Sequence, residues 1–190
     1  MARFFRAYFY FDMVKRFGDV PWYSEVISDK DWDKLQAPRT PRTVVLDSVM
    51  ADINYAIDHL PEVKTVNEIS RWTALALKSR ICLFEGTFRK YHTEFKLPEY
   101  EAFLDNAIAA SKELIERSGY KLYNTGHPES DYLNLFASLN ANEDEIILAR
   151  AFSDELQVYH NLNYYTMTAS YGRPGLEKRL VNSYLMRDGS

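Results

Sequence analysis

The side chains best suited to hold a ligand lie in a polar connection between two helical patterns. Aromatic and charged residues are interspersed there: Trp22, Tyr23, Asp29, Asp31, Trp32, Asp33 and Arg39. A sugar ring has an apolar C–H face that can stack on an aromatic plane, and its hydroxyl groups pair with carboxylate or guanidinium groups. The connection therefore predicts a glycan-binding site built on its three rings and Arg39. The alternative is that these rings pin the connection onto the neighbouring helices, because large rings are usually buried.

A group of carboxylates could in principle serve as the acid and base of a glycoside-cleaving enzyme. The densest group comprises Asp131, Glu143, Asp144 and Glu145. Spacing in sequence does not set the separation of two carboxylates across a substrate, and residues 143–145 directly precede an apolar run, as charged residues of a solvated turn do. We interpret the group as surface charge and expect no catalytic residues. The markers of phosphoryl and acyl transfer, a Gly-rich phosphate loop and a Gly-x-Ser-x-Gly elbow, do not occur.

Neither the histidines nor the cysteine form a recognisable metal motif. The four histidines never lie three to five residues apart: His59, His92, His127 and His160. We expect them on the surface, with no metal or other cofactor. Cys82 has no partner for an internal disulfide and lies inside a helical pattern, so we interpret it as a small core residue rather than a reactive thiol.

Composition limits the class of protein. The net charge of -4 and the interleaving of basic with acidic residues provide no positive patch for nucleic acid. No stretch approaches the roughly 20 apolar residues that cross a bilayer, and no secretion signal opens the chain. The 190 residues suffice for one core, so residues 1–190 are expected to form a single domain. Because the chain opens inside a helical pattern and stops at a turn signal, we expect a fragment that lacks segments at both ends.

Two helices are expected before residue 61. Apolar residues recur at helical spacing from Phe4 to Phe17 in two rows, so this helix is expected to be covered on most sides. The rows are Phe4, Ala7, Tyr8, Phe11 and Val14, and Phe5, Phe9 and Met13. Gly18 ends the helix. Thr40 is expected to cap the next helix, with Pro41 in its first position and an inner stripe of Leu46, Met50, Ile53, Ile57 and Leu60.

A second helical pair is expected between Ser70 and Gly119. Ser70 opens a helix whose large apolar residues alternate with small ones: Ala76, Ser79, Cys82 and Gly86. Small residues let a neighbouring helix approach closely. Pro98 is expected to begin that neighbour. The two helical pairs predict a mainly α fold of tetratricopeptide-like hairpins with irregular loops and a short extended segment.

The regular helical spacing of apolar residues ends after Gly119. Residues 132–139 are expected to form a short helix, and the run from Glu145 to Ala149 a strand or buried extended segment. The stretch from His160 to Gly172 is expected to be an ordered loop, whose Asn163, Tyr164 and Tyr165 are secondary candidates for ligand contact. Pro174 to Tyr184 is expected to form a last helix, with Leu176, Leu180 and Tyr184 facing inward.

Many short segments, read in order, resemble the SusD/RagB family of outer-membrane nutrient-binding lipoproteins. They are residues 2–12, 16–21, 38–40, 52–61, 71–80, 118–122, 132–136, 143–147 and 184–189. The first two, ARFFRAYFYFD and RFGDVP, are similar to the family's aromatic helix and its exit. The resemblance covers essentially the whole chain, and the order of its segments agrees throughout.

The resemblance implies a helical scaffold that binds oligosaccharides or polysaccharides without cleaving them. It further implies a partnership with a SusC-like TonB-dependent transporter and a place on the outward-facing surface of the outer membrane, held by an amino-terminal lipid anchor absent from this chain. Two alternatives stay open: a helical scaffold that contacts the transporter without binding ligand, and a glycan-cleaving enzyme.

Overall fold

The computed structural model describes residues 1–171 and 175–184. The chain divides into two compact units, Met1–Ala149 and Arg150–Ser190, and each is described by itself. The described residues form helices and loops with no strand, which confirms the predicted mainly α fold. The prediction of a single domain over residues 1–190 stays a prediction.

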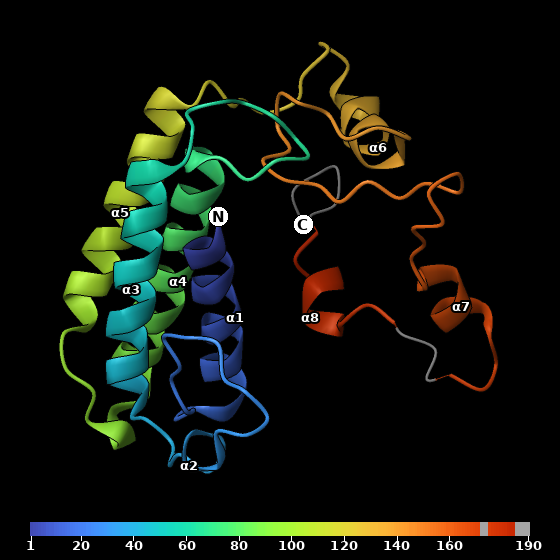
Figure 1. Ribbon diagram of the computed structural model, residues 1–190. Coiled ribbons are helices and arrows are strands. Elements are labelled where there is room, and N and C mark those ends of the chain that lie inside the picture. Colours follow the sequence, from blue (N-terminus) through green and yellow to red (C-terminus); the bar gives the residue numbers. More distant parts are fainter. Residues whose placement is uncertain (172–174, 185–190) are drawn as a thin grey trace. The chain divides into compact units, whose positions relative to one another are not determined.

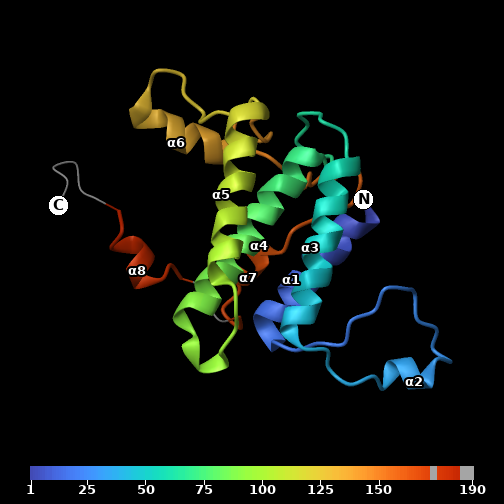
Figure 2. The same ribbon diagram turned by 90° about the vertical axis from the view of Figure 1, so that its left-hand side faces the viewer.

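Four long helices build the first unit (Figure 1 and Figure 2). They are α1 (Ala2–Phe17), α3 (Arg42–His59), α4 (Arg71–Tyr91) and α5 (Tyr100–Arg117). α1 packs on α3, α3 packs on α4, and α4 packs on α5. Two successive helical pairs, α1 with α3 and α4 with α5, therefore form the frame that the sequence predicts.

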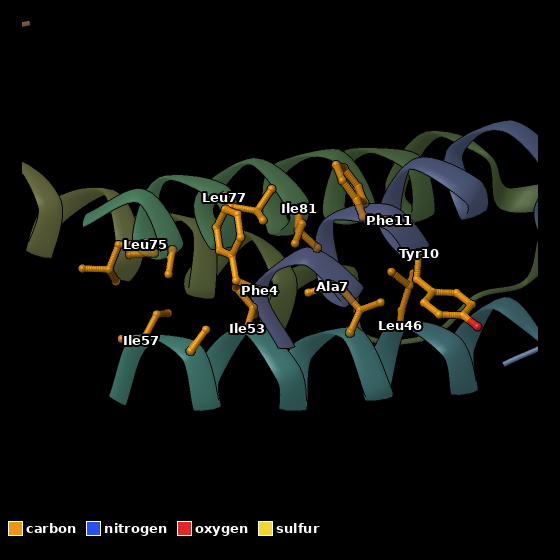
Figure 3. Close-up of a cluster of buried hydrophobic side chains, with 14 of the residues drawn as sticks. Phe4, Ala7, Tyr10, Phe11, Leu46, Ile53, Ile57, Leu75, Leu77 and Ile81 are labelled. Carbon is orange, nitrogen blue, oxygen red and sulfur yellow. The ribbon is translucent and has the colours of Figure 1, made fainter. Parts of the chain in front are cut away.

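The main core lies among α1, α3 and α4, as Figure 3 shows. Its buried side chains include Phe4, Ala7, Tyr10, Phe11, Leu46, Ile53, Ile57, Leu75, Leu77 and Ile81. Burial of such side chains contributes about 1.5–3 kcal/mol each and is the main force that holds the helices together. The helical spacing identified most of these residues correctly.

The prediction that α1 is covered on most sides is wrong for the described residues. Phe5, Tyr8 and Phe9 are 51%, 54% and 58% exposed. Tyr10 is buried in place of Tyr8, because the connection after α1 folds back and its Tyr23 backbone N–H donates to the Tyr10 hydroxyl at 2.9 Å. The sequence spacing gives two apolar rows on α1, but α3 and α4 leave Tyr8 of the first row and Phe5 and Phe9 of the second row exposed.

Small residues let α4 and α5 approach each other closely, as predicted. A Cβ atom placed on Gly86 would lie 2.7 Å from Cδ2 of Leu104, so only glycine fits against α5 there. About two helical turns before Gly86 on α4, the hydroxyl group of Ser79 lies 2.7 Å from that of Ser111 on α5.

Cys82 is a buried core residue, as the sequence predicts, and packs against Phe103 and Ala107 of α5. Desolvation raises the pKa of its thiol from 9.0 to about 11. Because the thiol loses its proton more easily in the unfolded chain than in the folded one, its contribution to stability is fully present below pH 9. This contribution is lost as the pH rises from about 9 to about 11. We expect the free energy of unfolding to fall by up to about 2–3 kcal/mol over that interval through this residue alone.

Urea unfolding of the wild type and of Cys82→Ala at several pH values measures this effect. Lysines and tyrosines titrate in the same interval in both proteins, so only the difference between their pH profiles reports on Cys82. Parallel profiles would contradict the prediction. A thiol reagent at pH 8 should modify Cys82 only when denaturant opens the core.

The helix starts are placed partly as predicted. Ser70 caps α4 through a capping box with Thr73. Thr40 does not cap α3 as predicted, because it pairs with Val20 in an isolated β-bridge and Pro41 takes the cap position. Since a prolyl side chain has no acceptor, Oδ1 of Asp19 accepts the Arg42 backbone N–H at 2.8 Å instead.

Pro98 does not begin α5. The helix starts two residues later, after Glu99 adopts φ 63°, and the 3-10 turn Thr93–Phe95 precedes it. The backbone carbonyl of Pro98 accepts a hydrogen bond from Nη1 of Arg89 at 2.7 Å. The connection between α4 and α5 is thus fixed by a side chain that the sequence alone does not single out.

Short helices complete the described chain. α2 (Trp32–Leu35) lies in the predicted polar connection, and α6 (Pro128–Ala137) is the predicted helix near residues 132–139. Residues 145–149 form no strand, although the Ala149 N–H donates to the Val66 carbonyl at 2.8 Å.

The second unit departs further from the predictions. The stretch expected to be a loop contains α7 (Leu162–Met167), whose backbone continues for more than one turn. The last expected helix is reduced to α8 (Lys178–Val181), and Pro174 lies outside the described residues. The residues expected to face inward are exposed: Leu176, Leu180 and Tyr184. A helix of one turn is too short to present a continuous apolar stripe.

Candidate functional site

The connection between α1 and α3 is anchored at several points along its length. Val20 and Thr40 pair at its base, where the Thr40 N–H donates to the Val20 carbonyl at 3.1 Å. Farther along, Nη1 of Arg6 donates to the carbonyl of Ser24 at 2.8 Å. The first bond joins the two ends of the connection to each other, and the second joins the connection to α1.

Trp22 pins this connection to the core. Its ring is half-buried and its centroid lies 4.3 Å from that of Tyr10. The Arg6 guanidinium lies 5.1 Å from the same ring, where a cation–π contact contributes to holding it. Burial is the main reason that the pKa of Tyr10 is raised. Trp22 therefore has the packing role that the sequence left open as its alternative.

Arg6 is itself positioned by Asp52 of α3. Its Nε and Nη2 atoms donate to the two carboxylate oxygens at 2.5 and 2.8 Å, and the Asp52 side chain is 3% exposed. This hydrogen bonding raises the pKa of Arg6. The pair connects α1 and α3 directly beneath the ring of Trp22.

The other three candidate residues lie nearer the solvent. The hydroxyl of Tyr23, which is half-buried, donates to the Lys34 carbonyl of α2 at 2.7 Å. Trp32, the first residue of α2, is 67% exposed. Arg39 is exposed and makes no hydrogen bond or ion pair with another residue in the described part of the chain. The geometry thus leaves Trp32 and Arg39 accessible, while Tyr23 supports α2; their part in ligand binding stays a prediction.

Three of the four carboxylates considered for catalysis have structural partners, and the fourth, Glu143, is exposed. Asp131 is 7% exposed, so its interpretation as surface charge is wrong; it accepts hydrogen bonds from the backbone N–H and hydroxyl of Thr125. The Thr125 hydrogen bonds are the main reason that the pKa of Asp131 is lowered. Oε2 of Glu145 accepts the Tyr123 N–H at 2.7 Å, and Asp144 forms ion pairs with lysine side chains.

A hollow of about 620 Å³ lies beside the exposed row of α1 and was not predicted from the sequence. Its lining includes Phe5 and Tyr8 of α1, Arg80 of α4 and residues 145–148. The apolar run at 145–149 and the apolar residues of α1 were both visible in the sequence. Their proximity was not, because more than 130 residues separate them.

The tyrosines expected to be secondary candidates form a cluster in the second unit. The ring centroids of Tyr164 and Tyr165 are 5.8 Å apart, and the hydroxyl of Tyr164 donates to that of Tyr171 at 3.1 Å. Tyr171 was not predicted as part of this group. The turn after α7 brings it back, since its N–H donates to the Thr168 carbonyl.

The fold and the anchored connection define a helical-hairpin scaffold that presents aromatic side chains. Comparison with known proteins then shows what the chain is similar to. Residues 1–83 match the model of the SusD-like family described as starch-binding and associating with the outer membrane. The chain is similar to SusD-like proteins in its family-model match, its curated relatives and its structural neighbours, which confirms the resemblance seen in the sequence. None of the described helices is long and apolar enough to cross a membrane.

Individual relatives agree with this assignment. SusD-like protein P2 of Formosa agariphila is 33% identical over 91 residues, which are 47% of this chain and 18% of that protein. SusD-like protein P25 of the same organism is 25% identical over 159 residues, 82% of this chain and 26% of that protein. The crystal structure of a SusD-like protein from Bacteroides fragilis superposes with a TM-score of 0.60 at 26% identity, covering 82% of this chain and 27% of that one. The chain thus spans about a quarter or less of the length of these relatives.

Proposed function

We propose that this chain is a non-catalytic, glycan-binding component of an outer-membrane nutrient-uptake complex. Its partner in this proposal is a SusC-like TonB-dependent transporter, and its place is the outward-facing surface of the outer membrane. The family-model match supports the class of ligand, because the family model is described as starch-binding and associating with the outer membrane.

The observation that carries the proposal is the exposure of Trp32 on an anchored connection. An indole that is 67% exposed offers an apolar plane to a sugar ring, and the Tyr23 hydroxyl donates to the Lys34 carbonyl of the same short helix. Because the connection is ordered before binding, less conformational entropy is lost when a ligand docks. Asp33 and Arg39, both exposed, supply a hydrogen-bond acceptor and a donor for hydroxyl groups nearby in the connection.

Substitution of Trp32 tests this function. We expect Trp32→Ala to bind oligosaccharide about tenfold more weakly, since tenfold corresponds to about 1.4 kcal/mol and an aromatic contact supplies energy of that order. Isothermal titration with maltoheptaose and with cellohexaose measures the effect for an α- and a β-glucan. Leu35→Ala, on the same short helix and 48% exposed, is the matched control and should bind as the wild type does. Equal affinities of Trp32→Ala and the wild type would contradict the assignment.

An apolar groove favours a second candidate function, that of a helical scaffold without ligand. The groove, of about 570 Å³, runs along α4 and α5, where Leu83, Ile108 and Ile115 are 54%, 65% and 74% exposed. Such a surface suits contact with another protein. Co-purification with the transporter, combined with no binding of any glycan, would favour this candidate. Release of reducing ends from polysaccharide by the purified protein would instead establish an enzyme.

A further inference from the structure

The hollow beside α1 has the dimensions and walls of a small-ligand site. Its volume of about 620 Å³ falls within the range of about 300–1,000 Å³ that is typical of ligand pockets. Phe5 and Tyr8 line it from α1, and both rings are about half exposed. Ala76 and Leu77 of α4 line it as well, together with Ile146 to Leu148. The walls are thus mainly apolar, with aromatic rings on one side.

Two charged side chains also line this hollow: Arg80, which donates hydrogen bonds, and Glu145, which accepts them. Arg80 forms no hydrogen bond or ion pair with any residue that the structure describes, so its five N–H donors stay available. Glu145 can only accept, and its Oε2 atom is held by the Tyr123 backbone N–H. The two side chains do not form an ion pair with each other. A ligand therefore meets both a free donor and a fixed acceptor.

We propose that the hollow is a second saccharide subsite that takes a neutral pyranose ring. The ligand class rests on the proposed function, and the location is new. The C–H face of the ring lies against Tyr8 and Phe5, one hydroxyl accepts a hydrogen bond from Arg80, and another donates to Glu145. An anionic sugar fits less well because the Glu145 carboxylate repels it. A purely apolar ligand also fits less well, because it would desolvate Arg80 without a partner.

The helical spacing of α1 separates this subsite from the Trp32 connection. Arg6 and Tyr10, one turn apart, contact the connection, whereas Tyr8 lies on the opposite side of a helix with 3.6 residues per turn. A short saccharide in the hollow therefore does not reach the residues that hold the connection. Substitutions at the two places are expected to act independently.

Titration calorimetry with cellohexaose and maltoheptaose on the intact chain tests the subsite. We expect Tyr8→Ala and Arg80→Gln each to weaken binding of the preferred saccharide about tenfold. Two matched controls, Phe9→Ala and Arg16→Gln, alter exposed residues of α1 that do not line the hollow, and they should bind as the wild type does. Hexagalacturonate, which carries carboxylates, should bind more weakly than the neutral saccharides. Circular dichroism of each variant checks that the helices are retained.

The outcomes separate this proposal from the proposed function. If Trp32→Ala loses affinity while Tyr8→Ala and Arg80→Gln bind as the wild type does, the second subsite is refuted and the glycan-binding function stands. If the wild type binds neither neutral saccharide nor hexagalacturonate, both are refuted. Tighter binding of hexagalacturonate than of the neutral saccharides, lost in Arg80→Gln, would overturn the assignment of a neutral ring.

Discussion

Replacing Phe11 by alanine should lower the free energy of unfolding by about 3–5 kcal/mol, the usual cost of removing a buried phenyl ring. Phe11 is 3% exposed, and its ring meets that of Phe84 edge to face at 5.6 Å. The contact joins α1 to α4. Removing the ring therefore leaves a cavity between these two helices, which are held apart by the rest of the core and cannot close it. Urea denaturation followed by circular dichroism at 222 nm measures the change.

Phe9→Ala is the matched control, because it removes the same ring from the same helix two positions away. Phe9 is 58% exposed, so we expect its truncation to change the free energy of unfolding by no more than about 0.5 kcal/mol. If Phe9→Ala lost as much stability as Phe11→Ala, the ring of Phe9 would have to be covered in solution, contrary to the structure.

The Glu85→Ala substitution should destabilise the chain by about 3–5 kcal/mol through uncompensated charge. Glu85 is fully buried on α4, and its carboxylate oxygens accept hydrogen bonds from Arg42 of α3 at 2.5 Å and from Arg89 at 2.7 Å. Removing the carboxylate leaves two guanidinium groups whose side chains are 11% and 3% exposed. Each also stacks on a ring, Phe88 or Phe103, and cannot turn to the solvent without losing that contact.

Thermal and urea unfolding of Glu85→Ala and of Glu85→Gln measure this network. The amide keeps an acceptor for one arginine, so the glutamine variant should lose less stability than the alanine variant. Glu116→Gln is the control, since its ion pair with Lys112 is exposed and 3.8 Å long, and such pairs contribute about 0–1 kcal/mol. A loss at Glu85 no greater than that at Glu116 would show that the network adds nothing to stability.

The sequence could not predict this buried charge cluster. Glu85 and Arg89 lie four residues apart on a helix, a spacing that most often marks an exposed ion pair. Their further partners are Arg42 of α3, which donates to Glu85, and the Pro98 carbonyl before α5, which accepts from Arg89. Both lie outside the helix whose pattern is being interpreted.

The sequence indicated a polar connection that contains aromatic rings, and whether this connection binds a ligand stays a prediction. Composition could not distinguish Trp22, which packs on Tyr10, from Trp32, which is exposed on α2. That distinction depends on where the connection folds back along α1.

The sequence by itself determined the long helices, most of the inner stripe of each, the close approach of α4 and α5 at Gly86, and the resemblance to SusD-like proteins. These features follow from local periodicity and residue size, which act over a few turns of helix. Only the tertiary structure decided which apolar residues of α1 are buried and which distant segment lines the hollow together with Arg80. The physical reason is that exposure is a property of the neighbouring helices: a ring is buried only where α3, α4 or a returning loop covers it, and no spacing within α1 encodes that contact.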